Sequence, residues 1–126
     1  MRSDRDRLLD MIDAIDAIAR HTAGGREALD GELVGAAAMR WVEIIGEAAG
    51  RITLELRVDH PQIPWSGMIS MRNRLVHGYF EIDADRVWDA VESELPELRD
   101  QLEVLLRELP GPPATEKGPG AEFDPR

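Results

Sequence analysis

The chain has 126 residues, a formal net charge of −10 and no cysteine. This length suits one domain with one core, and the missing cysteines exclude a disulfide framework and thiolate metal sites. The acidic balance argues against bulk electrostatic binding of nucleic acid, because phosphate affinity comes largely from Lys and Arg. No apolar run could cross a bilayer, and the charged N-terminus has no apolar signal-peptide core, so we expect a cytoplasmic protein without membrane partners.

Hydrophobic residues recur at helical spacing along most of the chain, and no stretch alternates long enough to make a convincing strand. The first predicted helix begins near Ser3, because Ser3 and Asp6 have the spacing of a capping box. Gly24-Gly25 is predicted to end the helix or its frayed last turn. Its predicted buried stripe is Leu8, Met11/Ile12, Ile15 and Ile18/Ala19.

A second helix is predicted from about Asp30 to Leu56. Gly35, Gly46 and Gly50 lie inside it, and each should cost about 1 kcal/mol relative to alanine. The usual reason to tolerate that cost is close approach of another backbone or of a ligand. The predicted apolar stripe is Leu33, Ala37, Trp41, Ile44/Ile45, Ala48 and Ile52. A charged ridge runs beside it and comprises Arg40, Glu43, Glu47 and Arg51.

Pro64 is placed to act as the first residue of a third helix, and Gly78 is a candidate terminator. A fourth helix follows, with Asp83 or Asp85 as its N-cap. Within it Pro96 removes one backbone donor, which predicts a kink or a restart.

Helices joined by short loops predict an all-α fold, an antiparallel bundle of four to five helices over residues 1–109. The remaining segment, 110–126, holds five of the chain's eight prolines and has no apolar period. We predict that it is a disordered tail.

The stretch RNRLVHGY, which begins at Arg72, gathers polar side chains capable of chemistry. At 100° per residue, Arg72 and Tyr79 fall within about 20° of each other, and Asn73 and His77 within about 40°. Arg72 and His77 are about 140° apart by the same arithmetic. One regular helix would not aim both at one target, so either the chain turns near His77 or two chains pair about a twofold axis.

Histidine titrates near neutral pH and can act as a general base or acid, and arginine forms bidentate hydrogen bonds with phosphate oxygens. Together, His77 and Arg72 therefore suffice for cleaving RNA without a metal. The other histidines, His21 and His60, are expected to sit alone in loops. No set of Asp and His at metal-ligand spacing competes with this chemistry.

Spacing alone also allows structural roles for the same residues. Arg72 could pair with Glu43 or Glu47, and His77 could cap helix carbonyls. Tyr79 could be a core aromatic with a solvated hydroxyl. The residues by themselves leave both interpretations open.

The pattern Arg72-x4-His77-x-Tyr79 resembles the RX4HXY motif of HEPN-domain proteins, specifically the HepT-like toxins. Three blocks resemble that family in the same order, at 40–53, at 60–83, which contains the motif, and at 87–106. The resemblance covers nearly the whole chain except the proline-rich tail.

This resemblance implies a helical bundle that forms a homodimer with a composite ribonuclease site in the dimer cleft. It implies Arg72 and His77 as catalytic residues, with Asn73 in support and no cofactor. It also implies a type VII toxin–antitoxin pair. In that pair an MntA-like minimal nucleotidyltransferase antitoxin transfers AMP from ATP onto Tyr79, where its bulk and charge would exclude the RNA phosphate.

Arg72 and Arg74 are expected to supply a local basic strip against the acidic background, with Arg51 and Arg57 as candidates to extend it. Glu43 and Glu47 are candidate supporting residues. The rival interpretation is a non-catalytic HEPN interaction module that binds a nucleotidyltransferase or a nucleotide through the same cleft. The acidic charge and the interior glycines, which suit close helix packing, favour that alternative.

Overall fold

The computed structural model describes residues 2–76 and 84–110. Within these ranges the chain is helical and has no strand. The long helices are α1 Asp4–His21, α2 Glu32–Arg51, α4 Trp65–Val76 and a continuous C-terminal helix made of α5 Ala84–Asp89, the π-helical turn η2 Ala90–Glu94 and α6 Leu95–Glu108. The short elements are the 3-10 turn η1 Arg26–Asp30 and α3 Leu54–Asp59. The predicted all-α fold is confirmed.

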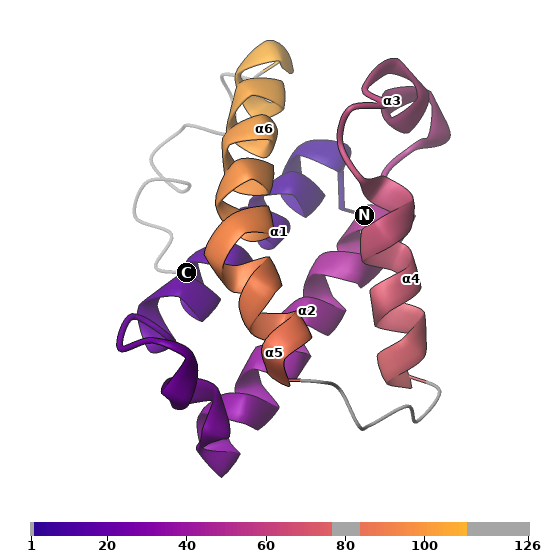
Figure 1. The fold of residues 1–126 in the computed structure, drawn as a ribbon. Helices are drawn as coiled ribbons and strands as arrows, with labels where there is room; N and C mark the ends of the chain where they lie inside the picture. The colour runs from indigo at the N-terminus through magenta and orange to yellow at the C-terminus, as the bar shows by residue number, and fades with distance from the viewer. Residues whose placement is uncertain (1, 77–83, 111–126) are drawn as a thin grey trace, which may run out of the picture.

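Helix α2 is the centre of the bundle. It packs against α1 on one side and against α4 on the other, and α1 also packs against α6. Figure 1 shows α4 and α6 side by side in front of α2, with α4 running antiparallel to α2. The largest fully buried side chains are Leu8, Met11, Ile18, Ile52, Ile63, Leu102 and Leu105. None of the helices in the described ranges has the length and hydrophobicity needed to span a membrane.

The start of α1 follows the prediction. Asp6 donates its backbone N–H to the Ser3 hydroxyl at 3.1 Å, and the Ser3 N–H donates back to the Asp6 carboxylate at 3.2 Å. This backbone hydrogen bond lowers the pKa of Asp6. The regular helix ends at His21, where the Thr22 N–H and hydroxyl both bond the carbonyl of Ile18, and turn residues continue to Gly24 as the predicted fray. The predicted stripe is buried except for Ala19, which is exposed.

The second predicted helix is in fact two helices, so its predicted end at Leu56 is wrong. The chain leaves helical geometry at Ile52, and Thr53 caps α3 by accepting the N–H of Leu56. Thr53 also donates its N–H and its hydroxyl to the carboxylate of Asp4, at 3.0 and 2.7 Å. Threonine favours helix caps over helix interiors, and the contact with Asp4 holds Thr53 in that position. Helix α2 therefore ends here, although the apolar periodicity of the sequence continues.

The predicted start of α2 at Asp30 is also wrong by two residues, since Asp30 closes η1 and α2 begins at Glu32. Leu33 was expected in the apolar stripe but is 82% exposed. It lies in the first turn of α2, which projects beyond the other labelled helices (Figure 1). Further along, Ile45, Ala48 and Ile52 are buried as predicted.

The C-terminal half departs from the prediction in small ways. Pro64 accepts the N–H of Met68, so α4 begins one residue after it, at Trp65. Asp85 lies inside α5 and is not its N-cap, while Asp83 and Gly78 lie outside the described residues. The irregularity expected at Pro96 is the π-helical turn before it, closed by the Leu95 N–H bonding the carbonyl of Ala90.

Candidate functional site

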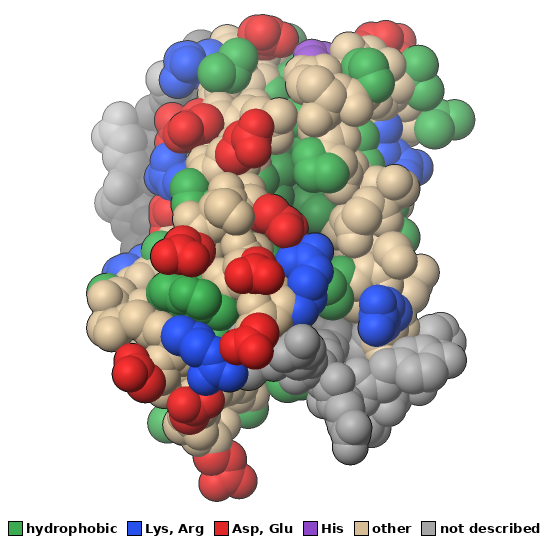
Figure 2. All heavy atoms as spheres, in the orientation of Figure 1, with side chains coloured by type: hydrophobic (Ala, Val, Ile, Leu, Met, Phe, Trp, Pro, Cys, Tyr) green, Lys and Arg blue, Asp and Glu red, His purple; other side chains and the backbone are tan. Residues whose placement is uncertain are grey.

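Helix α4 concentrates positive charge in a strongly acidic chain. It carries Arg72 and Arg74 and, alone among the helices of the described ranges, has no aspartate or glutamate. The pattern elsewhere is different: Figure 2 shows acidic side chains gathered over α5 and α6 on the same face of the molecule. The local basic site predicted at this helix is therefore present in the charge distribution.

Arg72 is half-buried, and its guanidinium has few hydrogen-bond partners among the described residues. Its Nη1 donates to Oδ1 of the exposed Asn73 at 3.3 Å. Its Nε is buried without a hydrogen-bond acceptor. Across residues 2–76 and 84–110, no carboxylate lies within ion-pair distance of Arg72 or of the exposed Arg74. A buried donor without a partner costs free energy, so this arrangement needs an explanation.

Glu43 and Glu47 do not neutralise Arg72, so that structural alternative is wrong. Glu43 accepts from Arg40 at 3.0 Å, and Glu47 lies 3.9 Å from Arg51. Both carboxylates therefore pair with arginines of their own helix, at the i, i+3 and i, i+4 spacings. Neither carboxylate pairs with Arg72 or Arg74.

The close approach predicted at the interior glycines is found where α2 crosses α4. At Gly46, which is buried, an added Cβ would lie 2.5 Å from the carbonyl oxygen of Met68 and closer still to the Cβ of Arg72. Real Cβ atoms do not approach other atoms so closely, so the two backbones can meet here because residue 46 is glycine.

Arg57 does not extend the basic strip at Arg74, because it lies on α3, which precedes the opposite end of α4 (Figure 1). Its Nε is likewise buried without an acceptor. Arg51 closes α2 and pairs with Glu47, so part of its charge is already compensated. The described cationic site therefore consists of Arg72 and Arg74.

His77 and Tyr79 lie outside the described residues. The helix that carries Arg72 is regular up to Val76, directly before His77. Convergence of Arg72 and His77 through a turn or a second chain therefore stays a prediction. The homodimer also stays a prediction. The disorder of the proline-rich tail stays one too, because residues 111–126 are outside the described ranges.

The other two histidines were expected to sit alone in loops, and this prediction is wrong. Both lie at helix ends and have structural contacts. His21 ends α1, with Nδ1 2.9 Å from the carbonyl of Ala17 and its ring stacked at a tilt 5.1 Å from Trp41. His60 caps α3, with Nδ1 3.0 Å from the carbonyl of Leu56 and Nε2 3.4 Å from Glu108. No group of three potential metal ligands occurs in the described part of the chain.

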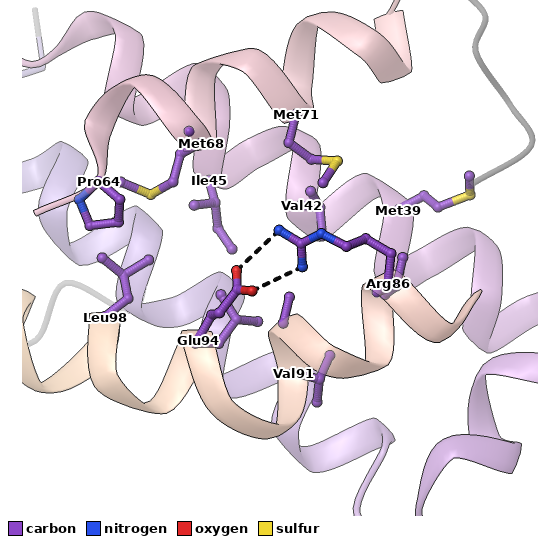
Figure 3. A pocket seen from close by; sticks show the side chains of 14 residues that line it. Met39, Val42, Ile45, Pro64, Met68, Met71, Arg86, Val91, Glu94 and Leu98 are labelled. Atoms are coloured by element: carbon purple, nitrogen blue, oxygen red, sulfur yellow. Dashed lines mark hydrogen bonds and ion pairs between the residues drawn. The ribbon is translucent and has the colours of Figure 1, made fainter. Parts of the chain in front are cut away.

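Sequence reasoning missed an apolar groove between α4 and the C-terminal helix. Its floor is α2, its volume is about 150 Å³, and three methionines line it (Figure 3), Met39, Met68 and Met71. Arg86 and Glu94 point toward one another along the wall made by α5 and η2, joined by two hydrogen bonds of 3.0 and 3.3 Å. The signal available in the sequence was the i, i+3 spacing of Met68 and Met71, directly before Arg72.

Comparison with known proteins agrees with this geometry. The family model described as "Ribonuclease HepT-like" matches residues 11–105. A protein of Thermococcus cleftensis named "Probable ribonuclease HepT" is 36% identical over 108 residues, which cover 84% of this chain and 98% of the relative. A protein of Methanocaldococcus jannaschii named "Putative RNase MJ1216" is 30% identical over 106 residues, 82% of this chain and 88% of the relative. No solved structure matches the chain significantly.

The matched range runs from the middle of α1 to the last turn of α6 and includes Arg72, Asn73 and Arg74. Three findings agree on the family. The fold is an all-α bundle, the family model spans most of the chain, and the relatives are matched over nearly their full length. The chain belongs to the HepT-like ribonuclease family.

Proposed function

We propose that this protein is a metal-independent endoribonuclease that acts as the toxin of a toxin–antitoxin pair in the cytoplasm. The observation that carries the proposal is Arg72, a half-buried guanidinium without a carboxylate partner among the described residues, on a helix that bears no acid. An unpaired arginine at this position is available to bind an RNA phosphate. Family membership supports the same reaction class.

In the proposed reaction, His77 removes the proton from a ribose 2′-hydroxyl, and the resulting alkoxide attacks the adjacent phosphorus. The bond to the 5′-oxygen of the next nucleotide breaks, and a protonated imidazole returns a proton to that oxygen. The products are a 2′,3′-cyclic phosphate and a free 5′-hydroxyl. Arg72 stabilises the negative charge that builds up on the phosphoryl oxygens, and Asn73, already hydrogen-bonded to it, helps to orient its guanidinium.

A homodimer would supply what one regular helix does not. Arg72 and the position of His77 differ by about 140° on a helical wheel, so one copy's arginine could act beside the other copy's histidine. The second histidine would then donate the proton to the leaving oxygen. This arrangement predicts that an Arg72→Ala chain mixed with a His77→Ala chain regains activity through the heterodimers that carry one intact composite site.

The chemistry is tested with purified protein and total RNA in EDTA. We expect cleavage that persists in the chelator and ends in cyclic phosphates, and that His77→Ala abolishes. Identical RNA patterns from the wild type and His77→Ala would refute the enzymatic proposal. Activity that disappears in EDTA and returns with a divalent cation would refute metal independence alone.

We further propose that a minimal nucleotidyltransferase antitoxin neutralises the toxin by transferring AMP to Tyr79. Phosphoryl oxygens of the adduct would occupy the place near Arg72 that the RNA phosphate needs. Coexpression with the antitoxin, followed by intact-mass measurement, should show an AMP-sized addition that is missing from Tyr79→Phe. An unchanged addition in that variant would move the acceptor to another residue.

The second candidate function is a non-catalytic interaction module, favoured by the methionine-lined groove beside α4. Methionine adapts to different partners and is frequent at binding surfaces. This alternative predicts that Met71→Glu releases the antitoxin, whereas Arg72→Ala leaves a growth defect on expression unchanged. Relief of toxicity by Arg72→Ala with the complex intact would count against it.

A further inference from the structure

We propose that Gly46 is a positioning residue for Arg72, so that a glycine on one helix determines where the phosphate-binding guanidinium on another helix lies. The inference rests on the role of Arg72 proposed above. It goes beyond that role because it assigns a function to a residue with no polar side chain, in the middle of α2.

The first step is the contact itself. The added Cβ of any other residue at position 46 would meet the Met68 carbonyl oxygen at 2.5 Å, the Arg72 Cβ at a shorter distance and the Arg72 Cγ at 3.2 Å. The two closest of these atoms, the Arg72 Cβ and the Met68 carbonyl oxygen, are fixed to the backbone of α4 and cannot rotate away. Helix α4 would have to shift, and Arg72 would move with it.

The second step is the burial of the arginine's stem. Because α4 lies directly on α2 at Gly46, the Nε of Arg72 is enclosed and finds no acceptor. With its Nε enclosed, Arg72 can donate to a ligand only through its two terminal nitrogens. One of these, Nη1, already donates to Asn73. The contact therefore restricts the guanidinium to a narrow range of positions before any RNA is bound, which lowers the entropy cost of binding.

The third step is the comparison with Gly50, one turn further along the same helix and facing the same partner. A Cβ added at Gly50 would lie 3.7 Å from the side chain of Ile69, an ordinary van der Waals contact. Of these two glycines facing α4, the one opposite Arg72 is therefore the one that cannot accept a Cβ, whereas Gly35, whose added Cβ would lie 2.9 Å from the Leu29 carbonyl oxygen, faces η1. Gly50→Ala is a matched control, because it adds the same methyl group to the same helix contact.

The test measures RNA binding in a His77→Ala background, which prevents cleavage. We expect Gly46→Ala to weaken binding about tenfold or more, as Arg72→Ala does. The dependence of log K on log salt concentration should also flatten by about 0.7, the value for one lost phosphate contact on a single strand. Gly50→Ala should leave both quantities unchanged.

The double variant Gly46→Ala/Arg72→Ala separates positioning from general damage. If Gly46 acts through Arg72, the double variant binds RNA as Arg72→Ala alone does, because nothing is left to misplace. Additive losses, or parental binding by Gly46→Ala, would overturn the inference. Parental binding by Arg72→Ala would instead refute the proposed role of Arg72, so the two failures are distinguishable.

A measurement on the unaltered protein covers the case in which Gly46→Ala does not fold. Proton exchange at the Arg72 Nε–H, assigned by comparison with Arg72→Lys, should be at least about tenfold slower than at Arg107, whose side chain is 69% exposed. Equal exchange rates at the two arginines would show that the contact does not hold the side chain, and would overturn the inference.

Discussion

Two half-buried arginines at helix contacts, Arg99 and Arg72, have opposite surroundings. Arg99, on α6, bonds Asp16 of α1 at 2.6 and 3.1 Å and Glu103 at 2.8 Å. Among the described residues, Arg72, on α4, bonds Asn73 alone. Arg99 is paired with two carboxylates, whereas no carboxylate of the described ranges pairs with Arg72. We propose that Arg99 is a structural arginine and Arg72 a functional one.

The two contacts also differ in how the helices meet. Helix α6, which packs against α1, buries Leu98, Leu102 and Leu105, large side chains that remove much apolar surface from water. Where α2 packs against α4, it presents Gly46, whose missing Cβ permits close approach. We propose that this close approach serves to place the side chain of Arg72.

The largest expected effect comes from removing the available arginine. Arg72→Ala should lower RNA cleavage about 10²- to 10³-fold, as expected when one donor to the developing charge is lost. Stability should change by less than about 0.5 kcal/mol, because an unpartnered guanidinium contributes little to folding. Steady-state cleavage of a fluorogenic RNA and a urea unfolding curve measure the two quantities.

Arg99→Ala is the control for that prediction, since it removes an arginine of similar exposure from the other contact. Its cleavage rate per folded molecule should equal that of the wild type. If Arg99→Ala loses cleavage as severely as Arg72→Ala, the distinction between a structural and a functional arginine is wrong.

Local rules predicted much of the fold. The Ser3–Asp6 capping box and the stripe of α1 follow from neighbouring residues alone, and the box and every stripe position except Ala19 were predicted correctly. Thr53 was not predicted, because its cap depends on Asp4, 49 positions earlier in the chain. Leu33 was misassigned because periodicity shows which face of a helix is apolar but not where the neighbouring helices end.

The site divides in the same way. The motif predicted Arg72 as a site residue, with Asn73 beside it in support, and the glycines of α2 indicated a close approach somewhere along that helix. That the approach occurs at Gly46, opposite Arg72, depends on how α2 and α4 cross, which no local pattern contains. The pairing of Glu43 with Arg40 and of Glu47 with Arg51 could have been inferred from i, i+3 and i, i+4 spacing.

A smaller effect is expected from breaking the paired arginine. Arg99→Ala should destabilise the fold by about 1 kcal/mol, since its bonds to Asp16 and Glu103 are partly screened by solvent. That corresponds to a fall in Tm of roughly 4 °C for a domain of this size. Differential scanning calorimetry measures the shift. An unchanged Tm would mean that the network contributes nothing to stability and would weaken the contrast with Arg72.

The smallest effect is the pH dependence of the same contact. The hydrogen bond from Arg99 lowers the pKa of Asp16 below its ordinary value, so the carboxylate binds its proton more weakly in the folded than in the unfolded chain. The stability that this shift contributes is therefore present above the unfolded pKa, near 4, and is lost as pH falls through the folded value. Asp16→Asn should be less stable than the wild type at pH 7, by less than about 1 kcal/mol, and the difference should shrink toward pH 2. Urea unfolding at both pH values measures it, and a difference that stays constant with pH would show that the contact stabilises the fold through packing and not through charge.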